Sequence, residues 1–335
     1  MRAVKATLLL LLVAATAGAQ GARRRAIGWP FQLVPCIPGT VAYAPGIGDF
    51  AVSGAFVYFG DANGGIWRVS KDGGVAPVLL ARVGNAPVVS VEVDATRVFF
   101  TLLTGELTGD LYSMPKDGGA PVTVATALIT PVMLASDAQF IYWVSLGTIS
   151  GEDFLSDGAV RRVAKAGGAV QTLVGGLSFP LALAVSNNTV YYGETGIAAG
   201  NTSFGLRRVP AEGGTVVKLF DGGPVTSIAA DAANAYFIVF RLGTGLVDVD
   251  RISLAGGAPA PLVTNLDFAD GLTLQGGTLY YAAEVNEMTS VQAVPAAGGS
   301  PRTVKEVELL LARLAFDDCL VYYSTALETI ARAAR

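Results

Sequence analysis

Histidine is absent from this chain of 335 residues, and cysteine occurs only twice. Without an imidazole the chain cannot build a Ser-His-Asp or Cys-His pair, a histidine general base or a histidine metal ligand. Enzymes that rely on an essential histidine are therefore excluded. Carboxylate and amide oxygens are present, and these are the ligands that Ca²⁺ takes in proteins.

Long hydrophobic runs are also missing, except at the N-terminus. Arg2 and Lys5 precede an almost wholly apolar, leucine-rich stretch over 6–16, and small residues follow as far as Ala19. This order predicts a signal peptide over 1–19 that is cut after Ala19. The apolar run is shorter than the roughly 20 residues that a membrane span needs. We therefore expect a periplasmic or secreted protein without membrane insertion; the alternative is an uncleaved N-terminal anchor.

Charged residues make up only 15% of the chain, and 27 acidic residues outnumber 23 basic ones. The formal net charge is −4 at pH 7, and loss of the predicted signal peptide makes it more negative. A mildly acidic chain does not favour nucleic acid or an anionic membrane surface as a partner. The 41 glycines and 16 prolines instead indicate many tight turns.

An aromatic pair returns along the chain at intervals of roughly 40 to 50 residues, a spacing typical of propeller blades. The seven pairs are Tyr58-Phe59, Phe99-Phe100, Tyr142-Trp143, Tyr191-Tyr192, Tyr236-Phe237, Tyr280-Tyr281 and Tyr322-Tyr323. Short β segments repeated at this period form one blade each. The sequence thus predicts an all-β fold, a seven-bladed β-propeller of four-stranded antiparallel blades, in a single domain over 20–335.

Each repeat can be divided into strands. In the second repeat we expect strands at 88–93, 97–102, 110–114 and 121–125, from the inside outward. The second strand is apolar at consecutive positions, so both of its faces must be covered, as stacking between blades would do. Paired glycines after the third strand supply the positive φ of tight turns. They are Gly73-Gly74, Gly118-Gly119, Gly167-Gly168, Gly213-Gly214, Gly256-Gly257 and Gly298-Gly299.

The last repeat lacks an outer strand. Its expected strands lie at 310–316, 320–324 and 329–333. Residues 30–40 precede the first repeat and are the natural donor of the missing strand. Closing the ring in this way would remove the exposed edges of an open sheet.

The two cysteines, Cys36 and Cys319, lie in the two segments that this closure would bring together. Two cysteines in an exported protein usually pair. We therefore predict a disulfide between Cys36 and Cys319; the alternative is two separately buried thiols.

Arginine recurs at one place in the third strand, and aspartate recurs before the second strand. The arginines are Arg68, Arg162, Arg208, Arg251 and Arg332, and the aspartates are Asp94, Asp137, Asp231 and Asp317. A residue that returns in most blades is more simply structural than part of one site. We predict that the arginine stems pack between blades with their heads on a carbonyl or carboxylate, and that the aspartates cap their own turns.

The loops between the second and third strands carry carboxylates that do not follow the repeat. The longest loop contains Glu152, Asp153 and Asp157, and the next one begins at Glu194. Further loop residues are Glu106, Asp110, Asn201, Asp248, Glu284, Asn286 and Glu287. These loops gather on one face, which we interpret as a candidate site for a cation or a positively charged ligand. The alternative is a solvated rim that keeps the protein soluble.

Three residues break the small, apolar pattern of the inner strands: Glu92, Asp270 and Arg313. Alternate residues of a strand point to the same face, which in these strands is the central axis. We hypothesise that the three side chains line the mouth of the axis together.

The repeats resemble those of bacterial exported propellers. Phe140-Ile141-Tyr142-Trp143, followed by Val160-Arg161-Arg162-Val163 and Gly167-Gly168, is similar to repeats of the TolB-like, NHL and YWTD-type families. The resemblance covers roughly residues 40–335 and implies the propeller fold. It implies no catalytic residue, because these families mix scaffolds, receptors and some enzymes. The tetrapeptide core of the YWTD type is also absent.

We therefore expect a non-catalytic binding or scaffold propeller that is monomeric, has no cofactor, and uses one loop face for a protein, peptide or glycan. The alternative is a calcium-dependent, lactonase-type hydrolase in which Glu92 and Asp270 hold the metal.

Overall fold

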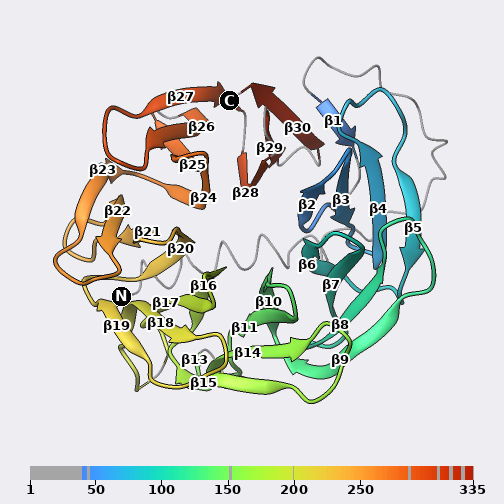
Figure 1. Cartoon of the computed structure of the whole chain (residues 1–335), viewed down its shortest axis with the longest axis horizontal. Helices are drawn as coiled ribbons and strands as arrows, with labels where there is room; N and C mark the ends of the chain where they lie inside the picture. The colour runs from blue at the N-terminus through green and yellow to red at the C-terminus, as the bar shows by residue number, and fades with distance from the viewer. Residues whose placement is uncertain are drawn as a thin grey trace.

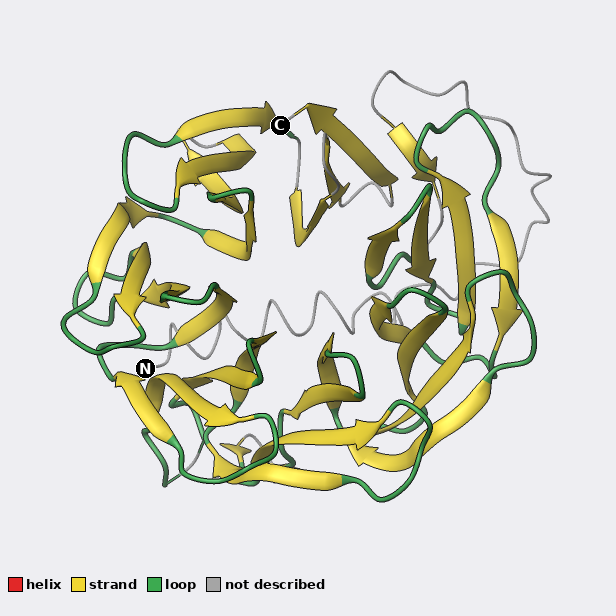
Figure 2. Cartoon of the chain, viewed as in Figure 1, coloured by secondary structure: helices red, strands yellow, loops and turns green. Residues whose placement is uncertain are grey.

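The computed structural model describes residues 40–43, 46–150, 153–198, 200–285, 288–307, 310–316, 320–325 and 329–334. This part of the chain is built from strands and turns, as Figure 2 shows. It holds no helix that is long and apolar enough to cross a membrane. The all-β prediction is confirmed.

Seven four-stranded sheets stand around a central axis, each with its strands in antiparallel order (Figure 1). Blade 1 contains β2 (Phe50–Ser53), β3 (Phe56–Gly60), β4 (Gly65–Ser70) and β5 (Val78–Arg82); blade 2 contains β6 (Val88–Val93), β7 (Arg97–Leu103), β8 (Thr108–Pro115) and β9 (Val122–Ile129). Blade 3 contains β10 (Pro131–Ser136), β11 (Phe140–Ser145), β14 (Gly158–Ala164) and β15 (Gln171–Leu177), with a small hairpin of β12 (Ile149–Ser150) and β13 (Asp153–Phe154) inserted. Blade 4 contains β16 (Pro180–Ser186), β17 (Thr189–Thr195), β18 (Phe204–Pro210) and β19 (Val217–Phe220); blade 5 contains β20 (Val225–Ala230), β21 (Asn234–Phe240), β22 (Val247–Ser253) and β23 (Ala260–Leu266). Blade 6 contains β24 (Ala269–Gln275), β25 (Thr278–Val285), β26 (Met288–Pro295) and β27 (Arg302–Glu306); blade 7 contains β28 (Leu310–Phe316), β29 (Leu320–Thr325), β30 (Thr329–Ala334) and β1 (Thr40–Tyr43).

An N-terminal strand completes the last blade, as predicted. β1 pairs antiparallel with β30 and forms the outer strand of blade 7. The strand lies at 40–43, where Val41 and Ala42 pack against Ile330 and the blade 1 residue Phe50. The prediction had placed it at 30–40, and the rest of that segment lies outside the described residues. Cys36 and Cys319 also lie outside them, so their disulfide stays a prediction.

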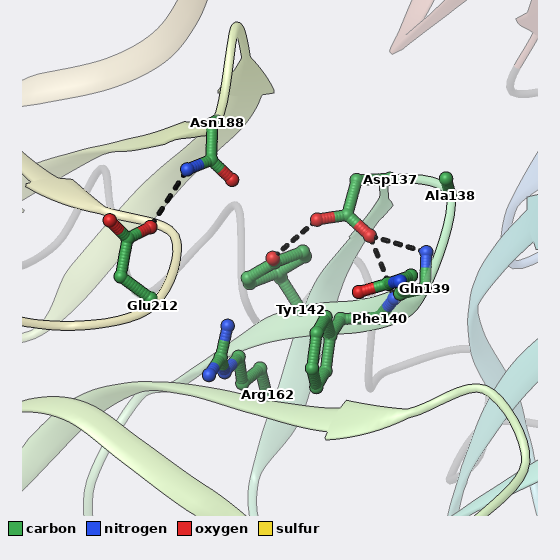
Figure 3. Close-up of a pocket in the computed structure, with 8 residues that line it drawn as sticks. All are labelled: Asp137, Ala138, Gln139, Phe140, Tyr142, Arg162, Asn188 and Glu212. Atoms are coloured by element: carbon green, nitrogen blue, oxygen red, sulfur yellow. Dashed lines mark hydrogen bonds between the residues drawn. The ribbon is translucent and has the colours of Figure 1, made fainter.

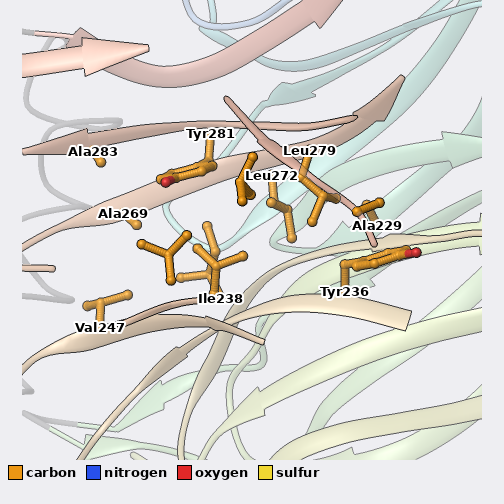
Figure 4. Packing of buried hydrophobic residues seen from close by; sticks show 13 residues of the cluster. Ala229, Tyr236, Ile238, Val247, Ala269, Leu272, Leu279, Tyr281 and Ala283 are labelled. Atoms are coloured by element: carbon orange, nitrogen blue, oxygen red, sulfur yellow. The ribbon is translucent and has the colours of Figure 1, made fainter. Parts of the chain in front are cut away.

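Blade stacking explains the paired aromatics. In β7, Phe99 packs against Trp143 of blade 3, whereas Phe100 packs against Tyr58 of blade 1. Neighbouring residues of a strand point to opposite faces, so one aromatic of each pair serves each neighbour. Figure 4 shows the same packing between blades 5 and 6, where Ile238 lies opposite Tyr281.

At three blade interfaces, a polar side chain in or just before an inner strand accepts a backbone N–H from the inner strand of the next blade. Val91 N donates to Asp49 Oδ2 (2.8 Å), Leu134 N donates to Ser90 Oγ (3.0 Å), and Leu272 N donates to Ser227 Oγ (2.9 Å). In β10 and β24 the donated N–H lies within a register shift, where it is not needed by the strand's own ladder, and in β6 the shift lies just before Val91. These bonds join blades 1 to 2, 2 to 3 and 5 to 6.

The recurring arginines are structural, as predicted, in four of five cases. Each donates to the carbonyl at the same place in the turn of the next blade: Arg68 to Lys116 (3.3 Å), Arg162 to Ala211, Arg251 to Ala296 (3.2 Å) and Arg332 to Lys71 (2.6 Å). The fifth, Arg208, pairs across the strands with Tyr191. Because the arginines bond to equivalent carbonyls, the positions of one blade can be matched to those of another residue by residue.

The recurring aspartates cap their turns, as predicted, in the three described cases. Their Oδ1 atoms accept the N–H groups two and three residues later: Asp94 from Thr96 and Arg97, Asp137 from Gln139 and Phe140, and Asp231 from Ala233 and Asn234. This is the Asx-turn geometry that lets a short side chain replace a backbone acceptor. Asp317 lies outside the described residues.

Asp94 also accepts from Lys165 Nζ of blade 3 at 2.9 Å. Burial alone would raise the pKa of Asp94, but hydrogen bonds from Thr96, Lys165 and Arg97 outweigh it and lower the pKa from 3.8 to about 2. A lowered pKa means that the carboxylate stabilises the fold above pH 4 and loses that effect as the pH falls toward 2. We expect Asp94→Asn to cost about 2 kcal/mol at neutral pH and nearly nothing near pH 2.

Urea titrations at several pH values measure this difference, and Asp117→Asn is the control. The Asp117 side chain is 96% exposed and pairs with Arg68 at the surface. Its loss should change stability little at any pH. Equal effects of the two substitutions would contradict the proposed role of Asp94.

Candidate binding surfaces

The order of the strands gives the ring two faces. Loops from the second to the third strand, and from the fourth strand to the next blade, lie on one side, which we call the loop face. Hairpins from the first to the second strand and the Gly-Gly turns lie on the other side, which we call the turn face. The predicted carboxylates of the acidic rim that lie in the described residues belong to the loop face.

Two of the rim carboxylates hold the loop face in shape. Asp157 accepts from Thr148 N (2.8 Å) and Thr148 Oγ1 (2.7 Å), which closes the base of the long blade 3 loop. Glu194 is only 5% exposed and accepts from Ser178 N at 3.0 Å. Burial raises the pKa of Glu194 despite this bond and the nearby Arg207. Both carboxylates thus have a structural role in the loops, and their assignment to a binding site stays a prediction.

Asp153 is exposed on β13, on the loop face as predicted. Glu152 lies outside the described residues, as do Asn286 and Glu287 of blade 6.

Two further rim carboxylates, on third strands, accept hydrogen bonds from the outer strands of their blades. Ala127 N donates to Asp110 Oδ1 (2.9 Å), and Asn265 N donates to Asp248 Oδ1 (2.9 Å). Ala127 and Asn265 have φ angles of 53° and 62°, in the left-handed region that non-glycine residues seldom adopt. The two aspartates occupy the same place in their blades. Aligning the third strands would have revealed this structural role.

The inner-strand residues lie at different heights. Glu92 is next to last in β6, where it accepts from Ser136 Oγ at 2.8 Å near the turn face. Asp270 is second in β24, near the loop face, on the opposite side of the axis in Figure 1. Arg313 belongs to β28, and only its backbone is described. Glu92 pairs with Phe99, the first residue of its aromatic pair, whereas Asp270 pairs with Ala282, two residues after Tyr280, so the two carboxylates occupy different positions of the repeat.

Within the described ranges, no three carboxylate or cysteine side chains cluster as metal ligands would. Glu92 and Asp270 stand at different ends of inner strands in blades 2 and 6. The calcium-site alternative therefore finds no ligand set in these residues.

A buried ion cluster on blade 5 was missed from the sequence. Arg241 Nε lies 2.6 Å from Asp248 Oδ2, and Arg241 Nη2 lies 2.6 Å from Asp250 Oδ2. Asp250 is 0% exposed, and its Oδ1 accepts no hydrogen bond from the described part of the chain. Burial raises the pKa of Asp250, although Arg241 opposes the rise. The spacing of Asp248 and Asp250, which places both on one strand face, was the available signal.

Apolar side chains stand out on the loop face beside these polar groups. Ile149 and Leu155 flank the inserted hairpin of blade 3, Leu242 lies on the blade 5 loop, and Met288 begins β26 of blade 6; all four are exposed. Beneath the hairpin, Phe154 packs on Phe179 with 4.2 Å between ring centroids. The long loop therefore has its own small core.

The turn face carries a pocket of about 440 Å³ between blades 3 and 4 (Figure 3). It is lined by Asp137, Ala138, Gln139, Phe140, Tyr142, Arg162, Asn188 and Glu212. Figure 3 shows Asn188 and Glu212 on one side, Asp137 and Gln139 on the other, and Tyr142 between them. Tyr142 Oη donates to Asp137 Oδ2 (2.6 Å), and Asn188 Nδ2 donates to Glu212 Oε2 (2.8 Å). Sequence analysis had assigned no site to this face.

The sequence matches no family model and no curated protein. Its structure is similar to solved structures of low sequence identity. Nidogen, in a complex with laminin, is 16% identical over 76% of this chain and 92% of that chain, with a TM-score of 0.53. The WD40 propeller domain of Doa1 is 11% identical over 89% and 95% of the two chains, with a TM-score of 0.62. The tricorn protease is 13% identical over 88% of this chain and 33% of its own, with a TM-score of 0.64.

Similarity at these identities shows the fold alone. The match to propellers across most of this chain agrees with the seven blades described above. The chain is a seven-bladed β-propeller; the more specific resemblance to exported families stays a prediction.

Proposed function

We propose that this chain is an exported, non-catalytic binding propeller that docks a protein partner on its loop face. The observation that carries the proposal is the set of exposed apolar side chains on that face. Leu242 on blade 5 is 52% exposed, Met288 on blade 6 is 44% exposed, and Ile149 and Leu155 are exposed on the loop of blade 3. Exposed apolar surface that is rimmed by polar residues marks interaction sites, and we infer that these side chains on one face of the ring contribute to one such surface.

The loops that carry these side chains are held in place before any partner binds. The blade 3 loop is closed by the bonds of Asp157 to Thr148 and by the packing of Phe154 on Phe179. The blade 5 loop is closed by the hydrogen bond from Arg241 N to Leu246 O at 2.8 Å. Preorganised loops lose little conformational entropy on association, which leaves more of the contact energy for affinity.

Charge on the same face favours a partner with basic residues around an apolar centre. Glu106, Asp153 and Asp267 are exposed there. Complementary charge accelerates association and suppresses wrong partners more than it adds affinity. The predicted signal peptide 1–19 supports export. Nidogen, which shares the fold, was solved in a complex with a protein partner.

The double substitution Leu155→Asp and Leu242→Asp tests the face directly. Immobilised mature protein is exposed to the exported proteins of the source cell, and each protein that it retains is purified and its dissociation constant measured. We expect the variant to weaken binding by about a hundredfold or more, because each substitution places a carboxylate against the apolar centre of the partner in place of an apolar contact.

The matched control is the double substitution Val78→Asp and Val217→Asp, at exposed positions on the outer strands β5 and β19. It makes the same chemical change away from the loop face and should leave binding unchanged. Retention of the partner by the loop-face variant, or equal loss in both variants, would overturn the proposal. A ligand that proves to be a glycan would show that the partner class is wrong.

A further inference from the structure

We propose that the pocket between blades 3 and 4 on the turn face binds a primary ammonium group on an alkyl chain, the chemistry of a lysine side chain. The site lies on the face opposite the docking loops, so it is independent of the function proposed above.

The protein already binds its own lysines in this way at two other blade interfaces. Between blades 1 and 2, Lys116 Nζ donates to Ser53 Oγ at 2.7 Å and lies 5.7 Å from the centre of the Tyr58 ring. Between blades 2 and 3, Lys165 Nζ lies 2.9 Å from Asp94 Oδ2 and 5.5 Å from the Phe99 ring centre. In both, an ammonium reaches across the interface to the turn before the second strand and covers an aromatic ring.

At the interface of blades 3 and 4, the lysine is missing. The repeated arginine bond fixes the alignment, since Arg68 donates to the carbonyl of Lys116 and Arg162 donates to the carbonyl of Ala211. Ala211 therefore stands where Lys116 stands in blade 2. Its methyl side chain cannot cross the interface.

The groups that receive the lysine elsewhere are all present around the pocket. Asp137 corresponds to Asp94 of blade 2, and Tyr142 corresponds to Tyr58 and Phe99; both line the pocket. The cavity thus lies where an ammonium is held at the other two interfaces.

The side chains that line the pocket carry one more negative charge than positive charge, which favours binding of one cation. Its lining carries two carboxylates, Asp137 and Glu212, against the single guanidinium of Arg162. At the interface of blades 1 and 2, the equivalent groups are Arg68, Asp117 and the inserted Lys116, so an arginine and an ammonium coexist there.

The guanidinium of Arg162 is already engaged in contacts within the protein. Its Nε donates to Gln171 Oε1 at 2.8 Å, its Nη1 donates to Ala211 O, and its guanidinium carbon lies 4.0 Å from the Phe140 ring centre. Burial, then the hydrogen bond to Asp137, raises the pKa of Tyr142 to about 12, so the phenol stays neutral. Lys165, whose charge also reaches Asp137, is paired with Asp94.

The polar walls distinguish this pocket from the interface of blades 5 and 6. That interface has the same pair, with Tyr236 Oη donating to Asp231 Oδ2 at 2.9 Å, and Ala296 likewise replaces the lysine. However, alanines stand at 233 and 297, in place of Gln139 and Glu212. Because Glu212 Oε1 accepts no hydrogen bond from the described residues, it can receive an ammonium N–H. An ammonium has three such donors for Asp137 and Glu212 to share.

Isothermal titration calorimetry of the mature protein measures the affinity of the site for three amines. The probes are n-butylammonium, Nα-acetyl-lysine methylamide and a short peptide with one lysine. We expect saturable binding in the millimolar range for the small probes, since one solvated ion pair contributes little. The Nε-acetylated lysine probe should bind at least about tenfold more weakly because it has no charge. Equal affinity for the acetylated probe, or no saturable binding of any amine, would overturn the proposal.

The decisive variant is Ala211→Lys, which supplies the missing lysine from within and should block the pocket. We expect it to abolish probe binding, with an unchanged or raised melting temperature that shows correct folding. Ala296→Lys makes the same change between blades 5 and 6 and should leave binding intact. Glu212→Gln should weaken binding by about tenfold without involving the Asp137 turn cap. Unchanged binding by Ala211→Lys would refute the site.

The probes also separate two sources of the ammonium. A peptide that binds at least about tenfold more tightly than n-butylammonium identifies a lysine of a protein partner, because the walls at Gln139 and Asn188 then contribute. Equal affinity identifies a small free amine. Both results support the ammonium site.

Discussion

Val41→Asp is expected to reduce the free energy of unfolding by about 3–5 kcal/mol, because it places an unpaired carboxylate in the seam that closes the ring. Val41 is 2% exposed in β1, where it packs with Ile330 of β30 and Phe50 of blade 1. β1 is the only strand of blade 7 that comes from the start of the described sequence. Its loss would free the edge of β30 and separate the two ends of the propeller.

Urea titration followed by tryptophan fluorescence measures the effect, with Val78→Asp as the control. Val78 lies in β5, the outer strand of blade 1, and is 55% exposed. The same substitution there should change stability by less than about 0.5 kcal/mol. A Val41→Asp protein that unfolds at the same urea concentration as the parent would contradict closure by β1.

Arg241→Ala is expected to reduce the free energy of unfolding by about 3–5 kcal/mol at neutral pH, since it leaves a buried carboxylate without its counter-ion. Asp250 is 0% exposed and loses the partner that lies 2.6 Å away. Asp248 loses the same partner but keeps its hydrogen bond from Asn265 N.

The effect of Arg241→Ala should depend on pH. Burial raises the pKa of Asp250 above 3.8, and loss of Arg241 removes the charge that opposes this rise. An acid with a raised pKa in the folded state destabilises the fold when it is charged, so the penalty is full above that pKa. The variant should therefore approach the parent as the pH falls toward 4, where Asp250 binds a proton.

Adding Asp250→Asn to Arg241→Ala separates charge burial from lost packing. The double variant should recover most of the lost stability at neutral pH, because an amide costs less to bury than a carboxylate. It should also lose the pH dependence. The guanidinium carbon of Arg241 also lies 5.9 Å from the centre of the Phe220 ring. A single variant whose loss of stability is constant between pH 4 and 7 would indicate that Arg241 acts through this packing alone.

Local patterns predicted the blades well. The expected strands at 88–93 and 97–102 match β6 and β7 closely, since apolar periodicity and glycine turns act within a few residues. The aromatic pairs predicted stacking for the same reason: two buried faces need two large side chains. Recurrence in several blades also identified residues with a structural role. The turn-capping aspartates and the interblade arginines have the predicted contacts.

Residue type alone did not tell a ligand-binding carboxylate from a structural one. Glu194 and Asp157 have positions typical of a site, yet Asp157 accepts a hydrogen bond within its own loop and Glu194 accepts one from Ser178 in the connection between β15 and β16. Glu92 and Asp270 both belong to inner strands but differ in height, because Glu92 pairs with the first aromatic of its blade and Asp270 pairs two residues beyond that position. Such contacts depend on the three-dimensional path of the chain, which no local pattern contains.

The sequence by itself determined the number of blades, the positions of the strands and the structural use of the repeated residues, because each repeat is specified by short-range patterns and needs only its neighbour. The tertiary structure alone decided which groups meet across a blade interface. Ala211 is one more small residue in the sequence, but next to Asp137 and Tyr142 it leaves a pocket where other blades place a lysine. That difference arises between two repeats, so it can be seen only when both are packed together.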